Sequence, residues 1–295
     1  MSYYTSISGL KNAQTSLNVI SHNIANAETN GFKKSRTEFG DIVASSALAN
    51  PKRIQGSGSV VESITQNFSI GPVEQTGSAL DLAITGDGFF ETRSAAGQVL
   101  YTRNGSFAID AEGYIHDGSG NRLQGFIAPA GTDPTDPPAT GGAETRAVGA
   151  FKIPAFYQPR ADTPEAPADP QTPDAGPSPF TGIVISGDGK VIASYANGKT
   201  TDLGTVSLTT FVSPSGLKQV GSSNWERTGL SGEATRGAPN AGANGALLAG
   251  AIEHSNVDIA EELVNLITAQ RYFQANAKAI DTATQISQTI IQLRS

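Results

Sequence analysis

The sequence predicts an α+β fold: N- and C-terminal α-helices form a coiled-coil-like core domain, and the mostly β middle forms an antiparallel domain. Apolar residues recur at heptad-like spacing near each terminus, which is typical of helices that pair along a seam. Between the termini the apolar period changes to two, which is typical of strands with one buried face. The 33 glycines and 16 prolines also favour many turns.

The N-terminal helix is predicted over about 24 residues, from apolar positions separated by steps of three and four. Residues 1–27 carry one charged side chain, Lys11, and most other polar positions are Ser, Thr, Asn or Gln. An uncharged polar face costs little to bury when its hydrogen bonds are satisfied. We therefore expect this helix to be surrounded on more than one side. Its seam consists of Ile7, Leu10, Ala13, Leu17, Ile20, Ile24 and Ala27.

The C-terminal helix is predicted to run almost to the last residue, because no proline follows Pro239. Its start is indicated by the stretch HSNVDIAEEL, where Ser255 with Asp258, or Asp258 with Glu261, has capping-box spacing. Apolar residues recur every seven positions and at intervening positions of the seam. This second seam consists of Ile259, Leu263, Leu266, Ala269, Phe273, Ala277, Ile280, Ala283 and Ile290.

Strand and turn signals fill the middle of the chain. The stretch SALDLAIT alternates like a strand with one buried face. Asn104-Gly105 between strand formers predicts one β-hairpin, and residues 187–189 predict another. Most prolines fall in residues 129–180, among Asp, Thr and Ala, where we expect neither ladder hydrogen bonds nor a core.

These patterns divide the chain into parts with different roles. The expected parts are a terminal helical core domain (1–30 and 254–295), a connecting segment (31–59), an antiparallel β domain (60–128 and 181–253) and a Pro-rich insertion (129–180).

The sequence offers no motivated catalytic, cofactor-binding or metal-binding residues, so we predict a protein that is not an enzyme and takes no cofactor. The absence of cysteine excludes disulfides, thiol catalysis and Cys-ligated zinc. His22, His116 and His254 lack metal-ligand spacing. The stretch DGSGN lacks the rest of a calcium-loop pattern, and a Gly-rich turn is the better interpretation.

One short basic cluster contrasts with the net charge of −7. Phe32 with Lys33, Lys34 and Arg36 has the residue types that stack and bind a nucleic-acid strand. The chain as a whole lacks the basic footprint of such binders. We therefore favour a solvated or intersubunit charge cluster and predict no nucleic-acid partner.

The two helical ends point to self-assembly. Contacts between different patches on successive copies build open helical filaments when the rotation does not close a ring. Two alternatives remain at this point: the helices cap one monomeric domain, or the β domain is a binding module for carbohydrate or nucleic acid. No segment has the length and apolarity of a membrane span, and the N-terminus lacks signal-peptide features, so we expect no membrane insertion and no cleaved leader.

The stretch SGLKNAQTSLNVISHNIANAETNGFKKSRTEFGD resembles the N-terminal signature of bacterial flagellar rod and hook proteins. In that family a Leu-spaced helix runs into an Asn-Ile-Ala-Asn motif and a Thr-x-Gly-Phe-Lys turn. We expect the glycine of this turn to end the helix with a positive φ, the aromatic residue to anchor the exit, and the basic residues to face a neighbour or solvent. The motif and joint residues here are Asn23, Asn26, Thr29, Gly31 and Phe32.

The stretch HSNVDIAEELVNLITAQRYFQANAKAI is similar to the family's C-terminal signature, and ALDLAITGDGFF is similar to its first β-domain strands. SYYTSISGL and GLKQVGSSNWERT look most like hook proteins, although residues 129–180 stand where hook proteins commonly carry an outer β domain. The resemblance therefore implies a subunit of the hook, a flexible universal joint that transmits motor torque to the filament. The alternative is a distal rod protein, part of a rigid drive shaft.

The resemblance also implies partners and a location. The partners are further copies of this chain in a helical homopolymer, flagellar rod proteins, the hook cap, the hook–filament junction proteins and the type III export apparatus. The location is the extracellular hook of the bacterial flagellum.

Overall fold

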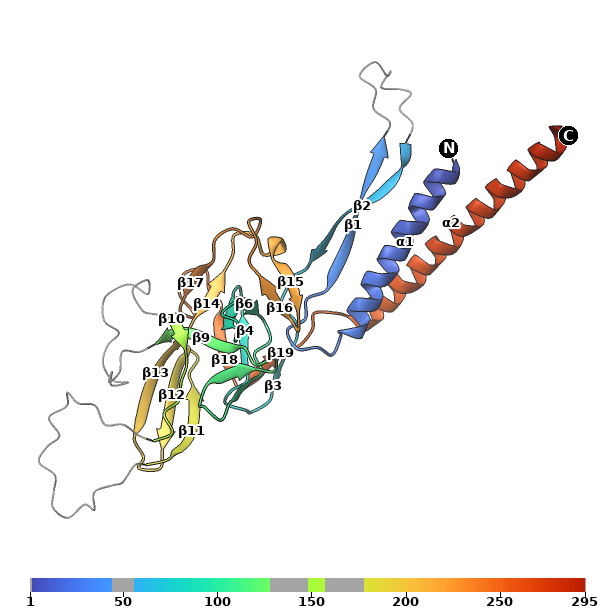
Figure 1. Ribbon diagram of the computed structural model, residues 1–295. Coiled ribbons are helices and arrows are strands. Elements are labelled where there is room, and N and C mark those ends of the chain that lie inside the picture. The colour runs from blue at the N-terminus through green and yellow to red at the C-terminus, as the bar shows by residue number, and fades with distance from the viewer. Residues whose placement is uncertain (1, 44–55, 128–147, 157–177, 295) are drawn as a thin grey trace, which may run out of the picture. The chain divides into compact units, whose positions relative to one another are not determined.

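The computed structural model describes residues 2–43, 56–127, 148–156 and 178–294 (Figure 1). Its contacts divide the chain into two compact units. We name the first the helical unit; it comprises Met1–Glu28, Lys33–Ser69 and Ser255–Ser295. We name the second the β unit; it comprises Thr29–Phe32 and Ile70–His254. The α+β class is confirmed, with a helix at each end and antiparallel strands between.

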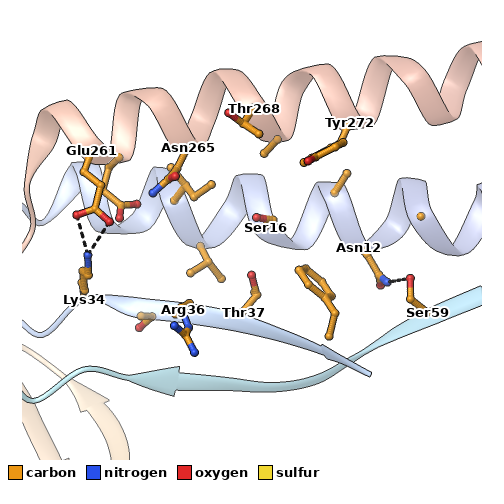
Figure 2. Close-up of a pocket in the computed structure, with 18 of the residues that line it drawn as sticks. Asn12, Ser16, Lys34, Arg36, Thr37, Ser59, Glu261, Asn265, Thr268 and Tyr272 are labelled. Carbon is orange, nitrogen blue, oxygen red and sulfur yellow. Dashed lines mark hydrogen bonds and ion pairs between the residues drawn. The ribbon is translucent and has the colours of Figure 1, made fainter. Parts of the chain in front are cut away.

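Two helices and one hairpin build the helical unit. Helix α1 spans Ser2–Ala25 and helix α2 spans Ile259–Arg294. Strands β1 (Ser35–Val43) and β2 (Gly56–Gln66) pair antiparallel, with register shifts after Glu38 and Ile42. Helix α1 lies between α2 and this hairpin and contacts both (Figures 1 and 2). Strand β1 thus lies wholly within the segment expected to be a connection.

The start of α2 follows from the chemistry of its cap. The Asp258 carboxylate accepts the backbone N–H groups of Ala260 (2.8 Å) and Glu261 (3.2 Å), which have no partner inside the helix. Asp258 is therefore the capping residue, whereas the Ser255 hydroxyl accepts from Val257 before the helix begins. The acidic first turn adds favourable interactions with the helix dipole.

The β unit is built around a branched 13-stranded sheet. Its main path runs β11 (Phe180–Ile185), β12 (Lys190–Tyr195), β13 (Thr200–Val206), β9 (Arg122–Ile127), β5 (Phe89–Arg93), β6 (Val99–Thr102), β16 (Asn224–Glu226) and β15 (Lys218–Gly221). Off this path lie β7 (Phe107–Ile109), β8 (Ile115–Asp117), β10 (Val148–Ala150), β14 (Leu208–Thr210) and β17 (Thr235–Gly237). Separate pairs join β18 (Ala246–Ala249) to β4 (Leu82–Thr85) and β19 (Ala251–Glu253) to β3 (Val73–Gln75), and Pro214–Gly216 form a 3-10 turn.

One continuous hydrophobic core supports these strands. It includes Leu82 and Ile84 of β4, as the alternation predicts, and Ala83 between them is buried as well. Residues 148–153, inside the expected insertion, also contribute: β10 pairs with β9, and Phe151 and Ile153 enter the core. The expectation that residues 129–180 form neither ladder nor core is therefore wrong for this part. Residues 128–147 and 157–177 lie outside the described residues.

The two hairpin predictions have opposite outcomes. The hairpin at residues 187–189 is confirmed, because β11 pairs antiparallel with β12. The hairpin at Asn104-Gly105 is wrong, because β6 pairs with β5 and β16 whereas β7 pairs with β8. The Gly105 carbonyl instead accepts the Leu82 N–H (2.9 Å), and a Cβ on Gly105 would lie 1.6 Å from the Leu82 oxygen. Glycine is needed there for close backbone approach rather than for a turn.

Candidate functional site: the paired helices and the turn at residues 29–32

Asn23 joins three elements of the helical unit. Its side-chain nitrogen donates to the Ser35 carbonyl (2.8 Å) and to a Glu262 carboxylate oxygen (3.2 Å), and its oxygen accepts the Ser35 N–H (2.9 Å). The side chain is buried, so these bonds are shielded from water. A carboxamide carries a donor and an acceptor side by side, so it can bond both backbone groups of one residue. Asn23 therefore fixes the end of α1 to the start of β1 and to the first turn of α2.

A second set of bonds holds the segment after the turn. The Asn256 side chain accepts the Lys34 N–H (2.8 Å) and donates to the Ser69 carbonyl (3.1 Å). The Lys33 ammonium donates to the same carbonyl (2.7 Å), and the Lys34 ammonium pairs with Glu261 at 3.1 Å. The beginning of β1, the end of the hairpin segment and the approach to α2 are thus tied together within the helical unit.

The residues of the basic cluster lie in part where the sequence interpretation did not place them. Lys33 is fully buried and hydrogen-bonded, so the expectation that every basic residue faces a neighbour or solvent is wrong for it. Phe32 is buried too, as expected for an anchor, and its ring is not available for stacking on a base. Arg36 is exposed and pairs with Glu38 (3.0 Å), and this bond lowers the pKa of the Glu38 carboxyl. Phe32 and Lys33 therefore do not form part of an exposed aromatic and basic surface of the kind that binds a nucleic-acid strand.

The turn at residues 29–32 belongs to the β unit. Gly31 has φ +67°, and a Cβ there would lie 2.4 Å from the Asn104 backbone nitrogen. The Phe32 N–H donates to the Thr29 carbonyl (3.2 Å). Positive φ and lack of space both require glycine. The positive φ was predicted from the turn, but the expectation that Gly31 ends the helix is wrong, because α1 already ends at Ala25. Asn26, the remaining motif residue, donates from its side chain to the His22 carbonyl (2.9 Å) in the last turn of α1.

Glu253 contacts the segments at which the chain enters or leaves the β unit. Its carboxylate accepts the Gly71 N–H (3.0 Å) and pairs with the Arg103 guanidinium (3.5 Å), and its carbonyl accepts the Gly31 N–H (2.8 Å). Glu253 is 0% exposed and Arg103 is 2% exposed. Burial lowers the pKa of Arg103, and the negative charge of Glu253 opposes that shift. Residues 29–32, 70–72 and 251–254 are therefore held by one buried ion pair and its backbone bonds.

Sequence reasoning missed this ion pair. Arg103 and Glu253 are 150 positions apart, and each stands alone between strand residues without a motif that marks it as buried. The available signal was weak: Glu253 stands next to His254, where the stretch similar to the family's C-terminal signature begins.

The larger predicted seam residues fall into three groups by exposure. Ile20 is buried. Those in partly covered positions are Ile7, Leu10, Leu17, Ile24, Leu266, Phe273 and Ile280. Those exposed on the surface of α2 are Ile259, Leu263 and Ile290. Small residues bring the helices together as well: the predicted seam residues Ala13 and Ala269 are buried, and a Cβ on Gly9, outside the seams, would lie 2.7 Å from the Asn276 side-chain oxygen.

An open groove of about 540 Å³ runs along the helical unit between α1, α2 and the hairpin (Figure 2). Its middle is lined by small and uncharged side chains, among them Ser16, Thr37 and Thr268. Asn12, on the same wall as Ser16, donates to the Ser59 hydroxyl (2.8 Å). Its charged residues gather toward the start of α2, where the Lys34–Glu261 pair lies. We name this feature the helix groove.

Two further findings concern the described residues. No group of His, Asp or Glu among them is arranged to hold a metal ion. No helix among them is long and apolar enough to cross a membrane.

Comparison with known proteins places these features in a family. Three family descriptions match: "Flagella basal body rod protein" over residues 4–33, "Flagellar hook protein FlgE/F/G D1 domain" over 83–193, and "Flagellar basal body rod FlgEFG protein C-terminal" over 248–293. The chain is 35% identical to the flagellar basal-body rod protein FlgG of Bacillus subtilis, over 99% of this chain and 98% of that protein. This chain belongs to the flagellar hook and rod protein family.

Hook and rod relatives both align with the whole chain. FlgG of Buchnera aphidicola from Acyrthosiphon pisum is 32% identical over 99% of each chain. The flagellar hook protein FlgE of Escherichia coli is 28% identical over 100% of each chain, in an alignment of 410 positions. The hook and rod family is a structural family rather than an enzyme family, which agrees with a site made of packing surfaces and buried hydrogen bonds.

Proposed function

We propose that the chain is a structural subunit of the flagellar hook, and that its helical unit drives self-assembly into a helical tube. The observation that carries this proposal is the uncovered apolar surface of α2. Helix α2 has 36 residues and α1 has 24, so α1 is too short to cover all of it. Exposed apolar side chains follow α2 from its first to its last turns: Ile259, Leu263, Val264, Ile267, Tyr272, Ile286, Ile290 and Ile291.

Exposed apolar surface on this scale marks a contact with another molecule. In a homopolymer that molecule is a further copy of the chain, so the predicted seam residues that one chain leaves exposed become buried between copies. In this proposal the tube acts as a universal joint that passes motor torque to the filament. Its other partners are the rod proteins, the hook cap, the hook–filament junction proteins and the type III export apparatus.

The assignment to the hook rests on the sequence stretches that look most like hook proteins, SYYTSISGL and GLKQVGSSNWERT. A second candidate is the distal rod. It is favoured by length, because the alignment with Bacillus subtilis FlgG has 305 positions, close to the 295 residues of this chain, whereas that with FlgE has 410. It is also favoured by identity, which is 35% for that FlgG and 28% for FlgE.

Truncation tests the proposed assembly. Removal of residues 1–25 or 270–295 is expected to abolish tubes seen by electron microscopy while the β unit stays folded, because each deletion removes one partner of the helix pair. Tubes of normal length from either truncated chain would overturn the proposal. Immunogold labelling of the cell-proximal flagellum then separates the two candidates: label outside the cell envelope supports the hook, and label within the periplasm supports the rod.

A further inference from the structure

The last turns of α2 have the composition of a helix that becomes buried. Residues 282–293 contain no charged side chain. Ile286 and Ile290 are four positions apart, so they lie on one face of the helix, and they are 55% and 59% exposed. We name residues 282–293 the helix tip.

The hydroxyl groups of the helix tip already donate hydrogen bonds inside the helix. Those of Thr284, Ser287 and Thr289 donate to the carbonyls four residues before them, at 2.6, 2.9 and 3.0 Å. A donor bonded in this way keeps its hydrogen bond when water is removed. The tip therefore combines an apolar stripe with hydroxyl groups that cost little to bury.

The helix groove has matching chemistry. The Thr268 hydroxyl donates to the Val264 carbonyl (2.9 Å), and the Asn276 side-chain nitrogen donates to the Tyr272 carbonyl (2.9 Å), so these two lining donors have partners within α2. Lys34 and Glu261, at the charged end, neutralise each other. An uncharged helix can occupy the uncharged part of this groove without burying an unpaired ion.

A tip cannot fill the groove of its own chain. Gly9 of α1 and Asn276 of α2 lie side by side, so they mark the same height along the axis of the helix pair. Ile290 is 14 residues beyond Asn276 and Ser16 is seven residues from Gly9 in the opposite direction, so they are about 30 Å apart along the helices at 1.5 Å per residue. The occupant must come from another molecule.

We propose that the helix tip of one subunit docks in the helix groove of the next. Tip and groove are different surfaces of the same unit, so the contact is head-to-tail and leaves a free tip and a free groove at the ends of every assembly. Such contacts grow into open filaments unless the rotation closes a ring. This inference rests on the proposed function and names the surfaces by which copies join.

Cysteine cross-linking tests the contact without a background of disulfides from native cysteines, because the chain contains no cysteine. The test variant carries Ser16→Cys in the groove and Ile290→Cys on the tip. The matched control carries Asn18→Cys with Ile290→Cys; Asn18 is exposed, does not line the groove, and lies about 200° around α1 from Ser16. Polymers of each variant are oxidised, dissolved in denaturant without reductant and run on a gel.

The expected result is a ladder of covalent trimers and larger species for Ser16→Cys/Ile290→Cys, at least tenfold stronger than for the control pair. Each single variant should give no species above a dimer. Polymers that form normally without the ladder would overturn the docking contact and leave the proposed function standing. Failure of the unsubstituted chain to polymerise under any condition, including in cells that build flagella, would overturn both.

Discussion

The buried Glu253–Arg103 pair allows a quantitative prediction. Glu253→Gln keeps the size of the side chain and an oxygen acceptor for Gly71, but it leaves the Arg103 charge without its partner at a site that is only 2% exposed. Removing one member of a buried ion pair costs about 3–5 kcal/mol. We therefore expect the free energy of unfolding of the β unit to fall by about that amount.

Urea denaturation of the full chain as a monomer measures this loss directly. Trp225 is the single tryptophan and is fully buried in the β unit, so its fluorescence reports the unfolding of that unit alone. With a slope of about 2–3 kcal/mol per molar urea, the midpoint should fall by about 1–2.5 M.

Two further variants make the prediction specific. Glu253→Gln combined with Arg103→Met removes both charges and should recover most of the loss, because no unpaired ion remains. Glu74→Gln removes the exposed partner of His254 and should leave the midpoint unchanged. If Glu253→Gln shifts the midpoint no more than Glu74→Gln, or if the double variant is less stable than the single one, Glu253 does not hold these segments as described.

Three other substitutions test the turn at residues 29–32, the hydrogen bonds of Asn23 and the pairing of the helices. Gly31→Val should destabilise the β unit by at least about 1–3 kcal/mol because it forces a β-branched residue to positive φ, whereas Lys34→Ala removes only a surface pair; equal urea midpoints would count against the turn. Asn23→Leu should lower the thermal midpoint of the helical circular-dichroism signal, because it leaves buried polar groups without hydrogen bonds at about 1–3 kcal/mol each; an unchanged midpoint would refute the role of Asn23 in joining α1 to β1. Leu266→Asp should abolish polymers in a sedimentation assay while Asn197→Asp, which adds the same charge on an exposed turn of the β unit, leaves them intact, and equal sedimentation of both would contradict the role of the seam.

Local signals predicted the helical ends well. Heptad-like spacing located both helices, and the acid three residues before Glu261 marked the start of α2 because a cap depends only on neighbouring residues. The positive φ of Gly31 was predictable for the same reason. The sequence did not predict which seam residues are covered within one chain, because this depends on how far the shorter helix, α1, extends along α2.

Contacts between distant residues were not predictable from one sequence. Asn104-Gly105 has the local form of a hairpin, yet the approach of Leu82 decides what Gly105 does. Phe151 and Ile153 lie among prolines and still join the core. Arg103 and Glu253 are paired only because the fold brings two distant segments together.

The central claim is that the terminal helices of many copies build one helical tube. The most direct test is cryo-electron microscopy of hook–basal bodies. These are taken from cells that express this chain and no other version of the protein. We predict a helically ordered tube in which α1 and α2 of successive subunits form a continuous layer, with the end of each α2 seated against the next subunit. A closed ring, or a tube in which the terminal helices of neighbouring subunits make no contact, would contradict it.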